Sequence, residues 1–250
     1  KNNPSLVNLK GLDSLSYVYI NINIENNSML PNLFGLGKLK YVGQEFSILN
    51  NQSLINLNGM INIRILNELE VRNNNSLNNL SGLQNIVKIG MLSISGNNNL
   101  VNFNGLNNLT EVEQFFIVQN NSLVNLIGLD SLKKCGWLSI NTNPNLINLS
   151  GIISLQEIES MDIIFNDAIV NLNGLDSIKR IKIIKIEGNI SLLSLNGINP
   201  LVSIEIYLRI RYNLKLSCCL LAKQIIHKNP LLREDIDIEI YNNDIGCSSI

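Results

Sequence analysis

The sequence has little of what most enzymes and nucleic-acid-binding proteins depend on. Its 250 residues include one histidine, and they contain no G-x-S-x-G, H-E-x-x-H, P-loop or dinucleotide-binding motif. The formal net charge of −1 argues against DNA as a partner, because a polyanion requires a basic surface. No apolar run approaches the length of a membrane-spanning helix. We therefore expect no catalysis, cofactor, metal site, nucleic-acid partner or membrane insertion by this segment.

The start of the chain lacks two further features. The opening stretch KNNPSL has no initiating methionine and no signal-peptide pattern. We therefore expect a piece of a longer precursor, without its N-terminal cap. Aromatic residues are also scarce, at 5% of the chain, so isoleucine and leucine must form the core.

The sequence instead contains one repeat many times over. A glycine in an L-x-G-L tetrad recurs at steps of 24, 24 and then 23 residues, which gives nine copies. These glycines are Gly11, Gly35, Gly59, Gly82, Gly105, Gly128, Gly151, Gly174 and Gly197. Apolar residues keep fixed offsets from each glycine and end in an alternating pair such as Leu92 and Ile94, which predicts a strand with one buried face. The extra residue of the longer copies falls just before this pair, where we expect a corner loop.

Asparagine forms two columns in the same register. The first is Asn3, Asn27, Asn51, Asn74, Asn97, Asn120, Asn143, Asn166 and Asn189, and the second runs from Asn8 to Asn171. A carboxamide both donates and accepts, so a stacked asparagine can bond the turn backbone of its own coil and of the next. We expect both columns to be structural ladders. Asp13, Asp130 and Asp176 share another offset, where bonds to turn backbone explain them.

These patterns predict a repeat solenoid, because a unit of this size buries its apolar face only in a stack. Each coil supplies one short strand, paired in parallel with the strands of its neighbours, in a body on the order of 50 Å long. We expect the repeats to fill residues 1–213 and residues 214–250 to cap the same domain.

The stretch IGMLSISGNNNL, from Ile89 to Leu100, resembles the leucine-rich-repeat core. The longer unit that begins at Leu80 resembles the receptor L-domain, most closely the Asn-rich versions of bacterial secreted surface proteins. The resemblance covers nearly the whole chain. It implies a right-handed β-helix or an α/β horseshoe, secreted to the cell surface. The ligand stays open, since such solenoids bind unrelated partners.

The last residues predict a helix and a strand that cap the solenoid. Ser217 can cap a helix that ends at Asn229-Pro230, and IDIEIYNNDIGC supplies a final alternating strand and an Asn pair. His227 in that helix has no catalytic neighbour in sequence. The resemblance implies a disulfide that joins Cys247 to Cys218 or Cys219, which suits an oxidising compartment. Free thiols at all four cysteines are the alternative, and Cys135 falls in an apolar column.

The outward strand positions form a candidate binding surface. If Leu138 and Ile140 point into the core, then Trp137 points out, with other apolar residues around it and charged residues beyond. The candidate binding residues are Met91, Phe116, Val118, Trp137, Ile164, Ile183, Arg72, Tyr207, Arg209 and Arg211. An apolar centre with a charged rim is typical of a protein-binding patch. The alternatives are a patch covered by another segment, and scattered surface residues without a role.

Recognition of a macromolecule at the cell surface, either a protein or a glycan, is therefore the first hypothesis. A structural spacer or stalk is the second. A substrate-targeting module of a larger secreted enzyme is the third.

Overall fold

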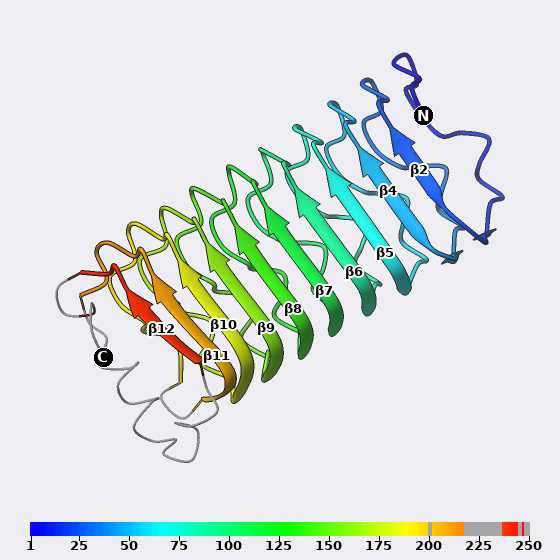
Figure 1. Cartoon of the computed structure of the whole chain (residues 1–250). Coiled ribbons are helices and arrows are strands. Elements are labelled where there is room, and N and C mark those ends of the chain that lie inside the picture. Colours follow the sequence, from blue (N-terminus) through cyan, green and yellow to red (C-terminus); the bar gives the residue numbers. More distant parts are fainter. Residues whose placement is uncertain (200–201, 218–236, 245–246, 248–250) are drawn as a thin grey trace.

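The chain folds into an elongated parallel β-solenoid (Figure 1). The computed structural model describes residues 1–199, 202–217, 237–244 and 247. Ten strands form one parallel sheet in the order β12-β11-β10-β9-β8-β7-β6-β5-β4-β2, and β1 pairs with β3 beside it. The strands are β1 (Tyr17–Val18), β2 (Ile22–Glu25), β3 (Tyr41–Val42), β4 (Glu45–Leu49), β5 (Ile65–Arg72), β6 (Lys88–Ser95), β7 (Glu111–Val118), β8 (Lys134–Asn141), β9 (Glu157–Ile164), β10 (Arg180–Glu187), β11 (Ser203–Arg211) and β12 (Asp237–Tyr241).

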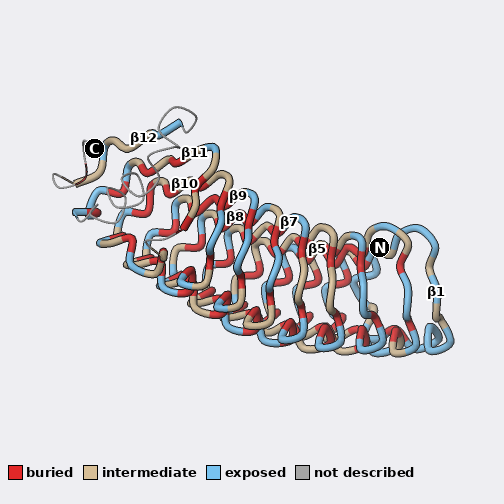
Figure 2. Tube along the Cα trace, turned by 90° about the horizontal axis from the view of Figure 1, so that it is seen from below, coloured by how far each residue is buried: buried red, intermediate tan, exposed pale blue. Residues whose placement is uncertain are grey.

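Buried residues recur along successive coils (Figure 2), and their side chains form one continuous core. Ile89, Leu92 and Ile94 of β6 are fully buried, and the equivalent residues of β7 to β10 are buried as well. The strands are longer than the alternating pair predicts, because the column of Ile89 also belongs to the strand. Each coil thus covers the apolar side of its neighbour, which confirms the solenoid.

The place of the inserted residues agrees with the prediction in the first two copies and differs from it in the ninth. In the first two copies the insertion separates β1 from β2 and β3 from β4, and in the ninth it makes a register shift in β11 opposite Ile181 and Ile183. In the first two copies the extra residue thus lies in a short bend between two strands, which agrees with the predicted corner loop, whereas in the ninth it lies inside β11, where the prediction is wrong. A bulge accommodates one extra residue because the pairing resumes in register after it.

The first asparagine column is a buried ladder, as predicted. Asn120 Nδ2 donates to the carbonyl of Ile94 in the preceding coil at 2.9 Å and to the carbonyl of Val118 in its own coil at 3.2 Å. Its Oδ1 accepts the backbone N–H of Asn97, and its own N–H donates to Oδ1 of Asn143. The same pattern recurs from Asn51 to Asn213, so each side chain joins three coils.

The second asparagine column does not connect coils. Oδ1 of Asn125 accepts the N–H of Ile127, two residues later in the same turn, and the other members behave alike. The prediction of a second inter-coil ladder is therefore wrong, because these side chains lie at the surface and not between coils. Asp130 and its equivalents accept the N–H of the repeat glycine, as their offset predicts.

From the second repeat onward, the repeat glycine lies where the backbones of adjacent coils touch. Gly151 has φ of 120°, and a Cβ there would lie 2.0 Å from the carbonyl oxygen of Leu126 in the preceding coil. A positive φ and a close backbone approach both favour glycine. The positive φ is common to all nine copies, and the close contact adds to it in every copy after the first.

The C-terminal part is described only in places. β12 pairs in parallel with β11, and Asn243 receives the ladder bonds of Asn213. The predicted cap helix, His227, Cys218 and Cys219 lie outside the described residues. Cys247 is buried, and its disulfide stays a prediction.

The described residues contain no α-helix, so the coils form a β-solenoid and not an α/β horseshoe. Among the described residues, no helix has the length and apolar character needed to cross a membrane.

Candidate binding face on the parallel strands

The parallel register arranges the outward side chains in columns along the solenoid. Gln114, Trp137 and Ser160 are neighbours in one column. Phe116, Ser139 and Asp162 form the next, and Val118, Asn141 and Ile164 form the third. The strand spacing of about 4.8 Å brings side chains of adjacent coils into contact. The columns therefore bring together residues that are 23 positions apart in sequence.

Trp137 is held in place by two neighbouring coils. Its ring meets that of Phe116 edge-to-face, with centroids 5.2 Å apart and planes at 77°. Its indole Nε1 donates a 3.2 Å hydrogen bond to Oδ2 of Asp162. The side chain still leaves 40% of its surface exposed, so a large aromatic is presented to solvent in a fixed orientation.

Asp162 is a residue of this site that the sequence pattern does not reveal. Its outward position predicts a solvated carboxylate, yet the residue is only 6% exposed. Lys185 Nζ lies 3.6 Å from Oδ1 of Asp162, and that oxygen has no hydrogen-bond donor in the described structure. Ser139, its neighbour in the column, is also buried. On this crowded face an outward position does not imply exposure.

The other apolar candidates lie one or two strands from Trp137. Met91 lies on β6, Val118 on β7, Ile164 on β9 and Ile183 on β10, and each is partly exposed. The columns thus bring the apolar candidates onto five neighbouring strands. An apolar centre of this kind is the part of an interface that becomes fully desolvated.

The arginines predicted as anchors are engaged within the protein. Arg209 Nε lies 2.9 Å from Oε2 of Glu239, and its guanidinium carbon lies 5.1 Å from the centre of the Tyr207 ring. Arg211 contacts Glu187 at 2.8 Å. Tyr207, Arg209 and Arg211 therefore form a rim on β11. The positive charges of its two arginines are already balanced by Glu239 and Glu187.

Arg72 lies on the same face at the opposite end, on β5. It pairs with Glu70 at 3.4 Å, and its side chain is 49% exposed. Surface pairs of this kind contribute little to stability. The structure brings Arg72 into the same surface as Trp137 but not into contact with it.

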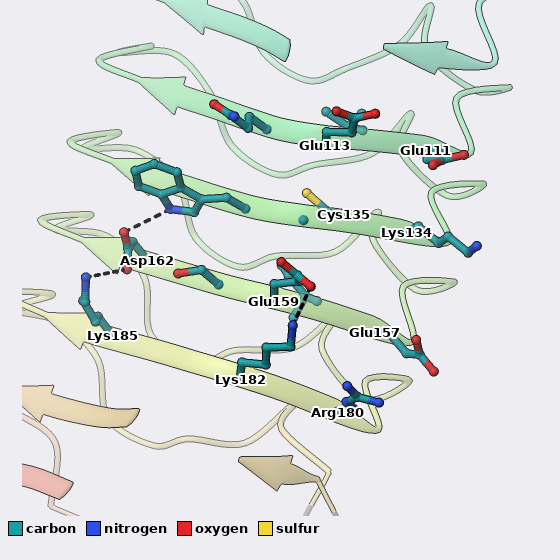
Figure 3. A pocket seen from close by; sticks show the side chains of 16 residues that line it. Glu111, Glu113, Lys134, Cys135, Glu157, Glu159, Asp162, Arg180, Lys182 and Lys185 are labelled. Atoms are coloured by element: carbon teal, nitrogen blue, oxygen red, sulfur yellow. Dashed lines mark hydrogen bonds and ion pairs between the residues drawn. The ribbon is translucent and has the colours of Figure 1, made fainter. Parts of the chain in front are cut away.

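A shallow hollow of about 770 Å³ lies beside Trp137 (Figure 3). It extends over strands β7 to β10, and charged residues line most of it. Its charged residues are Glu111, Glu113, Lys134, Glu157, Glu159, Asp162, Arg180, Lys182 and Lys185. Lys182 reaches from β10 to Glu159 on β9 at 2.6 Å, and its hydrogen bond holds the pKa of Glu159 below the ordinary value.

The cysteine at the floor of the hollow carries no reactive thiol. Cys135 belongs to the buried column of the core, and burial raises the pKa of its thiol to about 12. A thiol is a nucleophile only when it ionises, so Cys135 is inert at neutral pH. Within the described residues, no three histidine, cysteine or carboxylate side chains are grouped to hold a metal ion.

Comparisons of the chain with protein-family models, with curated proteins and with solved structures find no match. The function is therefore inferred from the geometry of this face.

Proposed function

We propose that this solenoid is a non-catalytic recognition module that binds a partner protein through the strand face centred on Trp137 and Phe116. The observation that carries the proposal is a single exposed tryptophan fixed by Phe116 and Asp162. Tryptophan is among the residues that most often dominate binding energy. Its rotamer is already set before binding, so little side-chain entropy is lost when a partner covers it. The half-buried Met91, Val118 and Ile164 extend the apolar area around it.

The cellular setting follows the resemblance to the receptor L-domain. We propose an extracellular, cell-surface location, with a disulfide from Cys247 to Cys218 or Cys219. Mass spectrometry of unreduced peptides tests the bond: a linked peptide pair is expected, and free thiols at all three cysteines would contradict it.

The experiment compares the wild type with the double variant Trp137→Ser/Phe116→Ser. Both proteins are immobilised and exposed to one extracellular protein mixture, and the captured proteins are quantified by mass spectrometry. Proteins captured by the wild type are purified and titrated against both forms. We expect saturable binding that the double variant weakens by at least about 100-fold, the range that the loss of two hot-spot side chains produces.

A matched control comes from another side of each coil. Val101 and Ile147 are exposed apolar residues outside the strands, and the variant Val101→Ser/Ile147→Ser removes a comparable apolar surface. Binding should survive in this control, and both double variants should unfold within about 1 kcal/mol of the wild type. Equal loss of binding in both variants would contradict the proposal.

A spacer or stalk is the second candidate. The long single sheet, with β2 and β12 at its opposite ends, suits this role (Figure 1). A spacer requires no fixed aromatic at mid-length, so binding that depends on Trp137 decides between the two.

A further inference from the structure

The strands around Trp137 carry a local excess of negative charge. The described face of β7, β8 and β9 carries formal charges of −2, +1 and −3, a net −4, although the whole chain is nearly neutral. Basic residues lie on the two strands outside this group, with Lys88 on β6 and Arg180, Lys182 and Lys185 on β10. The only cation within the three strands is Lys134, which has Glu111 and Glu157 as its register partners. With the three cations of β10 included, the residues that line the hollow carry five negative and four positive charges, and the negative charges lie on both sides of Trp137, on β7 and β9.

The lining of the hollow includes Gly136, which precedes Trp137 on β8 and lies close to the backbone of β7. A Cβ on Gly136 would lie 2.5 Å from the carbonyl oxygen of Glu113, so no larger residue fits without a shift. Glu113 on β7 and Glu159 on β9 are the register neighbours of Gly136 on the two flanking strands. Both side chains line the hollow and are labelled in Figure 3. Two strand spacings separate their backbones by roughly 10 Å. Their side chains are 66% and 67% exposed. A group seated over Gly136 thus has a carboxylate on each side and the indole next to it.

We infer that this hollow binds a basic side chain, lysine or arginine, of the partner protein. The inference rests on the proposed function and names the chemistry that the partner presents. A tryptophan ring is the best aromatic acceptor for an ammonium or guanidinium group. The two carboxylates then complete the charge recognition, since a guanidinium forms paired hydrogen bonds with carboxylate oxygens.

The existing ion pairs leave capacity for this ligand. Glu113 has only a distant contact, 3.7 Å from Lys88, and Glu157 has no ion pair within 4.0 Å in the described structure. Glu159 is already paired with Lys182. A guanidinium between the two glutamates can therefore bind the carboxylate of Glu113 and share the carboxylate of Glu159 with Lys182.

The test uses the only tryptophan as its reporter. Fluorescence of Trp137 is followed while the protein is titrated at low salt with a blocked tri-arginine peptide, a blocked tri-glutamate peptide and a neutral glucose hexasaccharide. We expect saturable binding of tri-arginine alone, and loss of the signal in 1 M salt because the contact is charged. The variant Glu113→Gln/Glu159→Gln should raise the Kd at least about tenfold. Glu68→Gln, which removes one carboxylate of the same face two strands from the hollow, should leave the Kd within about twofold.

The outcomes separate this inference from the proposed function. A response to the oligosaccharide instead of tri-arginine, or equal weakening by Glu68→Gln, would overturn the basic-side-chain assignment. The proposed function stands in that case if a captured protein still requires Trp137. If no protein requires Trp137, the proposed function fails, whatever tri-arginine does. Circular dichroism of each glutamine variant shows that the solenoid is intact.

Discussion

The indole Nε1 of Trp137 donates a 3.2 Å hydrogen bond to Asp162, the residue one column further along the strand on the next coil. A carboxylate that is 6% exposed thus fixes an aromatic ring that is 40% exposed. A ring held in this way is a preorganised contact, and the site depends on the support beneath it as well as on the tryptophan itself.

Replacement of Asp162 tests this support. Asp162→Ala removes the acceptor and should mobilise the indole, seen as lower fluorescence anisotropy of Trp137 and stronger acrylamide quenching. The loss of a hydrogen bond to a charged group should lower the free energy of unfolding by about 1.5–3 kcal/mol. Asp162→Asn keeps an acceptor and should retain most of the anisotropy. Equal anisotropy in wild type and Asp162→Ala would show that Phe116 alone holds the ring.

The asparagine ladder should dominate the stability of the coils. Asn120→Ala leaves the buried N–H of Asn97 without its acceptor, at about 1–3 kcal/mol, and removes the Nδ2 bonds to the carbonyls of Ile94 and Val118, at about 1 kcal/mol each, so a loss of about 3–5 kcal/mol is expected in urea unfolding. Asn125→Ala removes one bond in a surface turn and should cost about 1 kcal/mol. Similar losses in the two variants would contradict the ladder.

The repeat glycines differ in how closely the next coil approaches them. Gly151→Ala places a Cβ 2.0 Å from a carbonyl oxygen and should cost more than about 3 kcal/mol, because the backbones of two coils must separate. Gly11 has a similar φ of 102°, yet a Cβ there meets nothing within 4 Å. Gly11→Ala should therefore show only the backbone strain of about 1–2 kcal/mol. Thermal unfolding of the two variants separates the contact from the strain.

Two glutamates should affect stability in opposite directions. Burial, together with the nearby carboxylates of Glu45 and Glu70, raises the pKa of Glu68 in the folded state. Its protonation therefore stabilises the fold below the ordinary value of 4.5, and this stabilisation is lost as the pH rises through the folded pKa. Glu68→Gln should raise the free energy of unfolding at pH 7, and the gain should vanish in acid.

Glu159 provides the contrast, since its pKa is lowered by the hydrogen bond from Lys182. Its stabilisation is present above the ordinary value of 4.5 and is lost as the pH falls through the folded pKa. Glu159→Gln should therefore lower the free energy of unfolding at pH 7. Urea unfolding from pH 3 to pH 8 measures both effects, and shifts of the same sign would contradict the assignment.

The sequence predicts the solenoid well because its fold is determined by a repeat. Each column of repeated leucine, glycine or asparagine residues, such as the column of Asn120, corresponds to one position of the coil. The period of the sequence therefore gives the register of the strands. The period does not distinguish a ladder that joins coils from a bond within one turn, which is why Asn125 is misassigned. The bulge in β11 is missed for a related reason, since an insertion in a strand and one in a loop have the same length.

The site is less predictable, because the exposure of an outward residue depends on how far the side chains of the neighbouring strands cover it. The alternation of β8 places Trp137 outside, and the same rule applied to β9 does not reveal that Asp162 is buried. Arg209 and Arg211 have the composition of interface anchors, but their partners Glu239 and Glu187 are recognised only once the strands are aligned.

The most direct measurement is acrylamide quenching of Trp137 with and without a saturating amount of a purified partner captured by the wild type. Because Trp137 is the only tryptophan in the chain, a partner without tryptophan, or a tryptophan-free fragment of it, leaves one reporter. If the strand face is the binding surface, the quenching constant should fall severalfold as the exposed indole becomes covered. An unchanged quenching constant in the saturated complex would show that recognition takes place elsewhere on the solenoid.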